Sequence, residues 1–229
     1  MTDPDSSPPR LAVFDCDGTL VDSQHNIVAA AAAAWREYGL EPPPPAQIRL
    51  GIGLPLGEAV ARLRPGGGPA EIESLCILYK QAFQAQRRQP DHVEPLYPGA
   101  LQALEELAVS GTLLGVATGK SRRGLLSTLG RHGLLDSFVV LKTADDAPGK
   151  PNPHMLLDAM AETGARPETT VMIGDTVFDM AMARNARVRA VGVSWGYHER
   201  AELATAGAHA VIDSFGDLST TIASLLGDK

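Results

Sequence analysis

The sequence predicts an α/β fold: a doubly wound, Rossmann-like parallel sheet with an inserted all-helical cap domain. Short apolar segments alternate with helix-like stretches along most of the 229 residues, which is typical of a parallel sheet covered by helices on both faces. The alternation stops over residues 24–90, which read as helices only. An all-helical block between the first two strands of such a core indicates a second unit inserted into it.

The strand-like segments are short apolar runs. They lie at Leu11–Asp15, Thr112–Ala117, Phe138–Leu141, Thr170–Gly174, Ala190–Val193 and His209–Ile212. Helix-like stretches at about 99–110, 121–132, 153–163 and 178–186 separate the later strands. Because continuous apolar runs are typical of strands buried on both faces, these segments are expected to form the sheet.

Three helices are expected in the inserted block, and two proline clusters separate them. The helices are Gln24–Tyr38, about Leu56–Leu63 and Ala70–Arg88, and the breakers are Pro42–Pro45 and Pro65–Pro69. The chain should leave the core near Asp22 and return near Glu94–Gly99, a proline-rich stretch that suits a hinge. The predicted division is a disordered leader over 1–9, a core over 10–22 and 95–229, and a cap domain over 23–94.

Composition narrows the possible function classes. Hydrophobic residues make up 44% of the chain, enough for a substantial core. The formal net charge of −7 argues against a dedicated nucleic-acid binder, which usually carries a basic surface. Cys16 and Cys76 form no zinc or redox pattern. No apolar run approaches the length of a membrane span and no signal peptide is evident, so we expect a cytoplasmic protein with no membrane partner.

Two acids, Asp15 and Asp17, stand at the end of the first strand-like segment, followed by Gly18 and Thr19. Carboxylates at the tip of a buried strand are costly unless something uses them. Residues two apart on a strand point to the same face, so both acids are expected on one side. They could bind a hard cation or share nucleophile and general-acid work. The alternative is that Asp-Gly simply begins a turn.

Three further segments with reactive residues follow strands. Thr118 and Gly119 precede a helix, whose free N–H groups can bind an anion, although Thr118 or Ser121 could simply cap that helix. Lys150 lies in a proline-stiffened loop, where it could neutralise a phosphoryl oxygen or a carboxylate pair, or be solvated.

The last of these segments carries two acids, Asp175 and Asp179. Asp175 ends the fourth strand-like segment, and Asp179 begins the next helix, where it could serve the helix alone. Ligands of open α/β sheets gather at the carboxyl ends of strands. All the candidate segments are therefore expected to meet at one edge of the sheet.

The order of these segments resembles the haloacid dehalogenase superfamily: D-x-D-G-T, a strand-end Thr, a loop Lys and G-D-x-x-x-D. Its helical block resembles the cap of phosphoglycolate phosphatase-like members. The resemblance implies Asp15 as the nucleophile that forms an aspartyl-phosphate and Asp17 as general acid, then base. It implies Mg²⁺ held by the Asp15 carboxylate, the Asp17 carbonyl and Asp175, with Asp179 a ligand through water or an anchor behind the ligands.

The remaining site residues also follow from the resemblance. Thr118 and Gly119 are expected to bind phosphoryl oxygens, and Lys150 to balance the charge of Asp15 and the transferring group. An acid that works near neutral pH needs a raised pKa, and neighbouring negative charge is expected to raise that of Asp17. Asp17 also favours phosphate-ester chemistry, because the dehalogenases proper lack an acid at this position.

Substrate recognition is expected in the cap. The segment Gln47–Gly57 resembles the family's substrate loop, and Arg49 could pair with a substrate carboxylate or be solvated. His25 follows the first hinge, either facing the cleft or lying on the helix surface. Lys120, Arg122 and Arg123 could add positive charge to the site or solvate a helix.

The function that follows is Mg²⁺-dependent hydrolysis of a small phosphate monoester, with phosphoglycolate the first substrate to try. A phosphosugar mutase of the β-phosphoglucomutase type and an inorganic pyrophosphatase share the same motifs and stay open as alternatives. The expected partner is a small phosphorylated metabolite, with no nucleic acid, and the chain is expected to be a monomer or homodimer.

Overall fold

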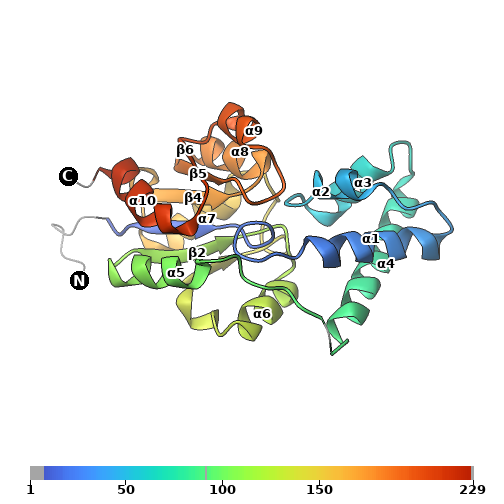
Figure 1. The fold of residues 1–229 in the computed structure, drawn as a ribbon. Helices are drawn as coiled ribbons and strands as arrows, with labels where there is room; N and C mark the ends of the chain where they lie inside the picture. The colour runs from blue at the N-terminus through green and yellow to red at the C-terminus, as the bar shows by residue number, and fades with distance from the viewer. Residues whose placement is uncertain (1–7, 91, 228–229) are drawn as a thin grey trace.

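The computed structural model describes residues 8–90 and 92–227. Its core is a six-stranded sheet in the order β3-β2-β1-β4-β5-β6, with every pair of neighbours parallel (Figure 1). The strands are β1 (Leu11–Phe14), β2 (Leu113–Ala117), β3 (Val140–Lys142), β4 (Thr170–Gly174), β5 (Arg189–Val193) and β6 (Ala210–Ile212). Strand order reverses beside β1, the position at which open α/β sheets place their ligands.

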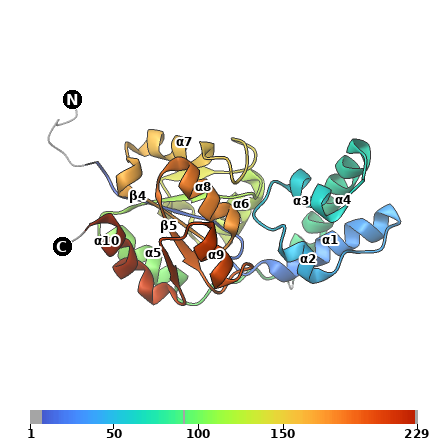
Figure 2. The ribbon, with the colours of Figure 1, turned by 90° about the horizontal axis from the view of Figure 1, so that it is seen from above.

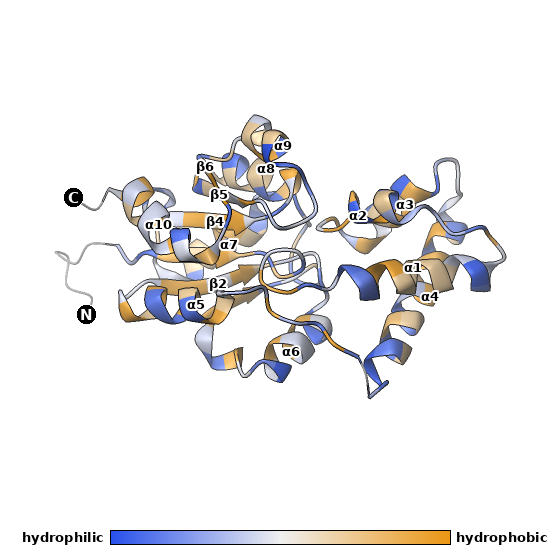
Figure 3. Ribbon diagram, in the orientation of Figure 1, coloured by the Kyte–Doolittle hydropathy of each residue, from blue (hydrophilic) through white to orange (hydrophobic). Residues whose placement is uncertain are grey.

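Helices cover both faces of this sheet, as the continuous apolar strands require (Figure 2). One face is covered by α5 (Ala100–Val109), α6 (Arg122–Arg131) and α10 (Leu218–Leu226), the other by α7 (His154–Thr163), α8 (Val177–Ala186) and α9 (Arg200–Ala206). The side chains of β1 alternate between the two: Ala12 and Phe14 join the first cluster, Leu11 and Val13 the second. The core strands are among the most hydrophobic stretches of the ribbon (Figure 3).

A helical cap is inserted between β1 and β2 and lies beyond the carboxyl ends of the strands (Figure 1). It consists of α1 (Gln24–Tyr38), α2 (Pro45–Arg49), α3 (Leu56–Leu63) and α4 (Pro69–Arg87). Its own apolar cluster joins Trp35, Val60 and Leu75 from three of these helices. The predicted fold class, a doubly wound parallel sheet with an inserted helical cap, is therefore confirmed.

The differences from the sequence-based expectation are local. The expected loop at Gln47–Gly57 begins inside the short helix α2, which starts at Pro45, a residue that suits a helix start but not an interior. Helices α9 and α10 were not expected. The seven residues of α9 are too few for a clear pattern, whereas Leu218, Ile222 and Leu225 of α10 do have helical spacing, so that helix was missed although its signal is present. Of the predicted disordered leader, residues 1–7 lie outside the described residues. No helix in the described part of the chain is long and apolar enough to cross a membrane.

Candidate active site

Side chains from four separate segments meet at the carboxyl edge of the sheet. Asp15 follows β1, Thr118 follows β2, Lys150 lies in the loop after β3, and Asp175 follows β4. Each is at most 1% exposed. Parallel pairing of β1 with both β2 and β4 brings these strand ends together, as the sequence predicted.

The centre of the site is a buried cluster of three carboxylates, those of Asp15, Asp175 and Asp179. One oxygen of each lies within 4.8 Å of the others. Within the described part of the chain, one cation contacts this cluster: Lys150 Nζ lies 2.8 Å from Oδ1 of Asp15 and 2.6 Å from Oδ1 of Asp179. This ammonium contacts two of the three carboxylates, and none of the described cations lies within ion-pair distance of Asp175, so the buried cluster is short of positive charge.

Burial together with this shortage of positive charge raises the pKa values of two of these carboxyl groups. Burial raises the pKa of Asp15 to about 7; Lys150 lowers it and Asp179 raises it. Burial, followed by the charges of Asp15 and Asp179, raises the pKa of Asp175 well above its ordinary value. Oδ2 of Asp15 is buried without a hydrogen-bond partner among the described residues. Closely spaced carboxylates with a free oxygen are the donor set of a hard divalent cation, and the residues fit one.

Hydrogen bonds fix the orientation of each carboxylate. Asp15 Oδ1 accepts from the Cys16 N–H at 2.7 Å. Asp175 accepts from the Thr19 hydroxyl at 2.8 Å through Oδ1 and from the Tyr197 N–H at 3.0 Å through Oδ2. The backbone approaches Asp175 so closely that a Cβ on Gly18 would collide with its carboxylate.

Asp179 has two functions in the fold. Its Oδ2 accepts from the Thr176 hydroxyl at 2.6 Å and from the Thr176 N–H at 3.0 Å, which caps α8. Its Oδ1 contacts Lys150. Asp179 therefore stabilises the start of α8, as one of the two expectations had it. The same side chain also contacts Lys150, the lysine that reaches Asp15.

Asp17 lies beside a cation, whereas the sequence analysis expected neighbouring acids to dominate its surroundings. Lys120 Nζ lies 2.7 Å from its Oδ1, and the Ser23 hydroxyl donates to the same atom at 2.5 Å. Burial raises the pKa of Asp17, but the Lys120 ammonium and these hydrogen bonds outweigh it and hold the pKa below its usual range. The expectation that neighbouring negative charge raises this pKa is therefore wrong here, because a cation lies closer than the other acids.

The segment Thr118–Ser121 connects β2 to α6. Ser121 caps α6 by accepting from the Gly124 N–H at 3.2 Å, so the capping alternative applies to this residue and leaves the Thr118 side chain at the site. Cap residues lie directly on this segment: a Cβ on Gly119 would stand 2.9 Å from the carbonyl oxygen of Gly53 and 3.0 Å from that of Leu54. Glycine is thus what allows the cap loop to approach.

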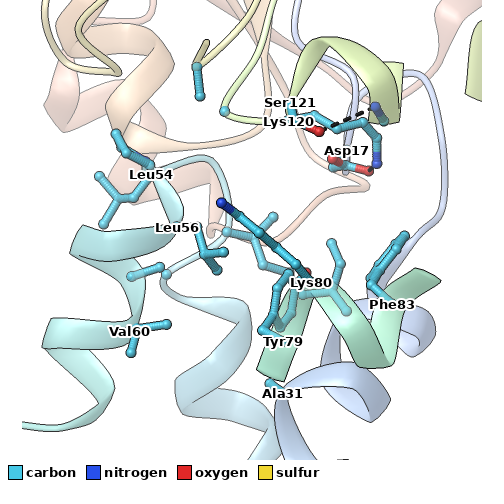
Figure 4. A pocket seen from close by; sticks show the side chains of 18 of the residues that line it. Asp17, Ala31, Leu54, Leu56, Val60, Tyr79, Lys80, Phe83, Lys120 and Ser121 are labelled. Atoms are coloured by element: carbon cyan, nitrogen blue, oxygen red, sulfur yellow. Dashed lines mark hydrogen bonds and ion pairs between the residues drawn. The ribbon is translucent and has the colours of Figure 1, made fainter. Parts of the chain in front are cut away.

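A cavity of about 490 Å³ lies between the core and the cap. Asp15, Asp17, Thr118, Gly119 and Lys120 line its core side. Figure 4 shows the opposite walls, with side chains from α3 on one side and from α4 on the other. The candidate catalytic edge of the sheet therefore opens into a partly open cavity large enough to hold a small molecule.

The two cap residues singled out in the sequence do not line this cavity. Arg49 ends α2 and is half-buried, with a buried Nε that has no hydrogen-bond partner among the described residues. His25 is exposed on α1. The helix-surface reading of His25 is the one that the structure agrees with, and the expected contact of Arg49 with substrate has no support in the cavity lining.

Several contacts at the site were not predicted. Lys120 was noted only as a possible source of charge; it is separated from Asp17 by 103 positions, and no local pattern reveals their pairing. Thr19 and Ser23 belong to the first motif, so their polar side chains were visible there. Tyr197 follows β5 and gives no local signal, because its contribution is a backbone N–H. Glu94 in the second hinge lies 3.7 Å from Lys120 and 3.5 Å from Arg87 of the cap.

Comparison with known proteins is consistent with this geometry. Residues 12–193 match the family of haloacid dehalogenase-like hydrolases. The chain is 35% identical to "Probable phosphatase IndB" of Dickeya dadantii over 94% of each protein. It is 34% identical to a phosphoglycolate phosphatase of Caulobacter vibrioides, over 93% of this chain and 90% of the relative.

The fold has equally close counterparts among solved structures. A hydrolase from Pseudomonas syringae, 29% identical, superposes with a TM-score of 0.82 over 94% of this chain and 98% of its own. Sequence and structure agree over nearly the full length, including the cap. The chain therefore belongs to the haloacid dehalogenase-like hydrolases, as a phosphoglycolate phosphatase-like member with a helical cap.

Proposed function

We propose that this enzyme hydrolyses the phosphate monoester of a small metabolite in two steps, with Asp15 as the nucleophile and Mg²⁺ as the cofactor. The observation that carries the proposal is Oδ2 of Asp15. This oxygen is buried, lacks a hydrogen-bond partner among the described residues, and belongs to a residue that lines the cavity. Phosphatase names among the relatives agree with it.

Mg²⁺ would be held by the carboxylates of Asp15 and Asp175 and by the backbone carbonyl of Asp17, with Asp179 positioned behind them. When bound, it supplies the positive charge that lets a phosphate dianion approach a carboxylate. Lys150 supplies the remaining charge from the opposite side of Asp15. Burial and the neighbouring carboxylates raise the pKa values of Asp15 and Asp175, so a bound dication would stabilise their charged forms.

In the first step a carboxylate oxygen of Asp15 forms a bond to phosphorus while the ester P–O bond breaks. Asp17 donates its proton to the departing alcohol oxygen. The Thr118 hydroxyl and the Gly119 N–H donate hydrogen bonds to the phosphoryl oxygens, and their fixed positions after β2 make this stabilisation preorganised. In the second step Asp17 takes a proton from water, which attacks phosphorus and releases inorganic phosphate from Asp15.

Lys120 controls when Asp17 can take part. In the observed ion pair Asp17 is a carboxylate and has no proton to give. An arriving phosphate offers the ammonium a second anion, which weakens its hold on Asp17 and lets the pKa of that acid rise. Lys120 lines the same cavity as Asp17, so this exchange needs no large movement.

Cap movement is part of the proposal. We assign residues 23–94 to a cap unit that hinges on the core at residue 22 and at 95–99. The loop of Gly53 and Leu54 lies against Gly119 of the core, and Glu94, next to the second hinge, lies 3.7 Å from Lys120. Opening at these hinges would admit substrate and release product.

The two alternative activities, phosphosugar mutase and inorganic pyrophosphatase, would each need a different set of side chains around the cavity. A phosphosugar mutase must hold many hydroxyl groups, and a pyrophosphatase must neutralise a second phosphate. The cap side of the cavity is mostly apolar, and its polar groups come from α4: the Tyr79 hydroxyl and the side chains of Lys80, Gln84 and Arg87. This favours hydrolysis of a monoester over both alternatives.

The test is a phosphate-release screen over roughly a hundred phosphorylated metabolites with Mg²⁺ present, phosphoglycolate among them, and with Asp15→Asn as the control. We expect release that chelation of Mg²⁺ and the Asp15→Asn substitution each abolish. Isomerised sugar phosphate without net release would indicate a mutase, and turnover of pyrophosphate alone would indicate a pyrophosphatase. Full activity in Asp15→Asn would refute the mechanism.

A further inference from the structure

We propose that the preferred substrates are phosphate monoesters whose alcohol part is an apolar, ring-sized group, not a short carboxylate or a sugar. This inference rests on the proposed function and specifies the substrate class for the same site. It comes from the cap wall of the cavity, whose chemistry is unlike that of the core wall.

The first three cap helices and the loop between α2 and α3 contribute no polar side chain to the cavity. Every lining residue from Ile27 to Leu63 is apolar or a glycine. Leu54, Leu56 and Val60 form one side of the space in Figure 4. Burial of apolar surface against such a wall is favourable, whereas a carboxylate or hydroxyl placed there loses its water without gaining a partner.

Aromatic rings form part of the opposite side. Tyr79 and Phe83 project from α4 with their ring centroids 5.9 Å apart. The Phe83 ring lies 4.8 Å from the guanidinium of Arg87 and 5.6 Å from Nζ of Lys120, the cation paired with Asp17. Phe83 therefore stands between the charged core wall and the apolar cap wall. A substrate with phosphate at Asp15 would extend past this ring into apolar surroundings.

The size of the cavity agrees with a ring-sized group. Its volume of about 490 Å³ falls within the ~300–1,000 Å³ of pockets that enclose drug-sized ligands. Phosphoglycolate carries only two carbons beyond its phosphate, so most of the apolar wall would stay uncovered. A substrate that covers this wall gains binding energy that phosphoglycolate cannot.

Besides Lys120, three cations in the lining could pair with a substrate carboxylate: Lys80, Arg87 and Arg123. Arg87 already contacts Glu94 and Thr128, and Arg123 lies on α6 of the core, so Lys80 is the candidate on the apolar side. Its side chain extends from α4 across the cavity towards Leu56 (Figure 4). It is an exposed residue, so its long apolar stem can line the wall while the ammonium reaches water. The ammonium also attracts an entering phosphate. The position of the Lys80 stem beside Leu56 is therefore compatible with an apolar substrate. The experiment below distinguishes this interpretation from binding of a substrate carboxylate by Lys80.

The test compares three primary alkyl phosphates on the full chain with Mg²⁺: 2-phenylethyl phosphate, glucose 6-phosphate and phosphoglycolate. Their leaving alcohols are similar in type, so differences report recognition. We expect kcat/KM for 2-phenylethyl phosphate to exceed both others by about 10-fold or more, the range for one or two apolar groups in a fitted pocket. Higher kcat/KM for phosphoglycolate or glucose 6-phosphate would overturn the inference and leave the phosphatase intact. Release from no phosphate monoester would refute the proposed function itself.

Two matched substitutions locate the effect. Leu56→Gln puts an amide of similar size into the wall, while Ile77→Gln makes the same kind of change on α4, where Ile77 is 50% exposed and outside the cavity lining. Leu56→Gln should lower kcat/KM for 2-phenylethyl phosphate about 10-fold and leave phosphoglycolate within about 3-fold. Ile77→Gln should change neither, and Leu56→Met should retain the preference. An equal loss for all substrates in Leu56→Gln would show a merely structural role and contradict the inference.

Discussion

Lys150→Met is expected to destabilise the protein strongly, because the substitution removes the ammonium that faces a buried carboxylate cluster. Lys150 is 0% exposed and contacts both Asp15 and Asp179. Removing one partner of a buried ion pair typically costs about 3–5 kcal/mol, since the remaining charge is left without compensation. For a chain of this size, 1 kcal/mol corresponds to roughly 2–4 °C. The expected fall in Tm is therefore about 6–20 °C.

The matched control is Lys142→Met. Lys142 is also mostly buried and lies 2.7 Å from Glu162, but that carboxylate is 60% exposed and stays solvated when the lysine is lost. Such a pair contributes about 0–1 kcal/mol. Both variants are compared with the unsubstituted protein by thermal and urea unfolding. The loss in Lys150→Met should also shrink at pH 5, because protonated carboxyls no longer need a cation.

Equal losses in Lys150→Met and Lys142→Met would refute this reasoning. A loss in Lys150→Met that does not depend on pH would also refute it, because it would mean that packing of the lysine stem, and not its charge, stabilises the site.

Three further outcomes follow from the site. Without Mg²⁺, the free energy of unfolding should fall by on the order of 4 kcal/mol as the pH rises from about 4 to 7. The pKa of Asp15 is about 7 in the folded state and 3.8 in the unfolded state, so over this range the folded state holds a proton that the unfolded state has lost. Urea unfolding should show that added Mg²⁺ reverses this fall. Lys120→Met should raise the pKa of Asp17 and shift the alkaline limb of the kcat/KM profile to higher pH. Gly149→Ala should lower kcat/KM by ~10- to 100-fold, because its Cβ would collide with Pro55 and displace the cap loop.

Each of these outcomes has its own control. Urea unfolding in EDTA defines the metal-free baseline, and a free energy of unfolding that rises towards pH 7 in EDTA would contradict the charge shortage at Asp15. Lys142→Met controls for Lys120→Met, and an unchanged alkaline limb would contradict the role given to the Lys120 pair. Gly130→Ala, on an open face of α6, should leave kcat/KM unchanged; equal losses in both glycine variants would contradict the cap-contact account.

The parts of this structure that were predictable depend on local pattern. Apolar runs marked all six strands, and the acids at their ends marked the edge where a ligand would bind, because parallel strands share that edge. Asp15, Lys150 and Asp175 were thus brought together by topology alone. Helix α2 was less visible, since its five residues are too few for periodicity to register.

What the sequence could not predict depends on side chains that reach across the fold. From the sequence, the Lys120 side chain could point to solvent or to Asp17, and only the packed structure shows that it pairs with Asp17. This pairing lowers the pKa of Asp17, whereas the sequence analysis expected that pKa to be raised. Arg49 looked suited to a carboxylate, yet the direction in which α2 presents it is set by tertiary packing. The apolar cap wall likewise exists only once three helices and a loop have assembled.

The most direct test of the central claim is whether Asp15 carries the phosphoryl group during turnover. The enzyme is mixed with Mg²⁺ and its best substrate, quenched in acid within the first turnovers, and analysed by peptide mass spectrometry. The account predicts one phosphoryl group on the peptide that contains Asp15 and none in Asp15→Asn, which should also release no phosphate. Steady phosphate release from Asp15→Asn, with no phosphorylated peptide in the unsubstituted enzyme, would contradict it.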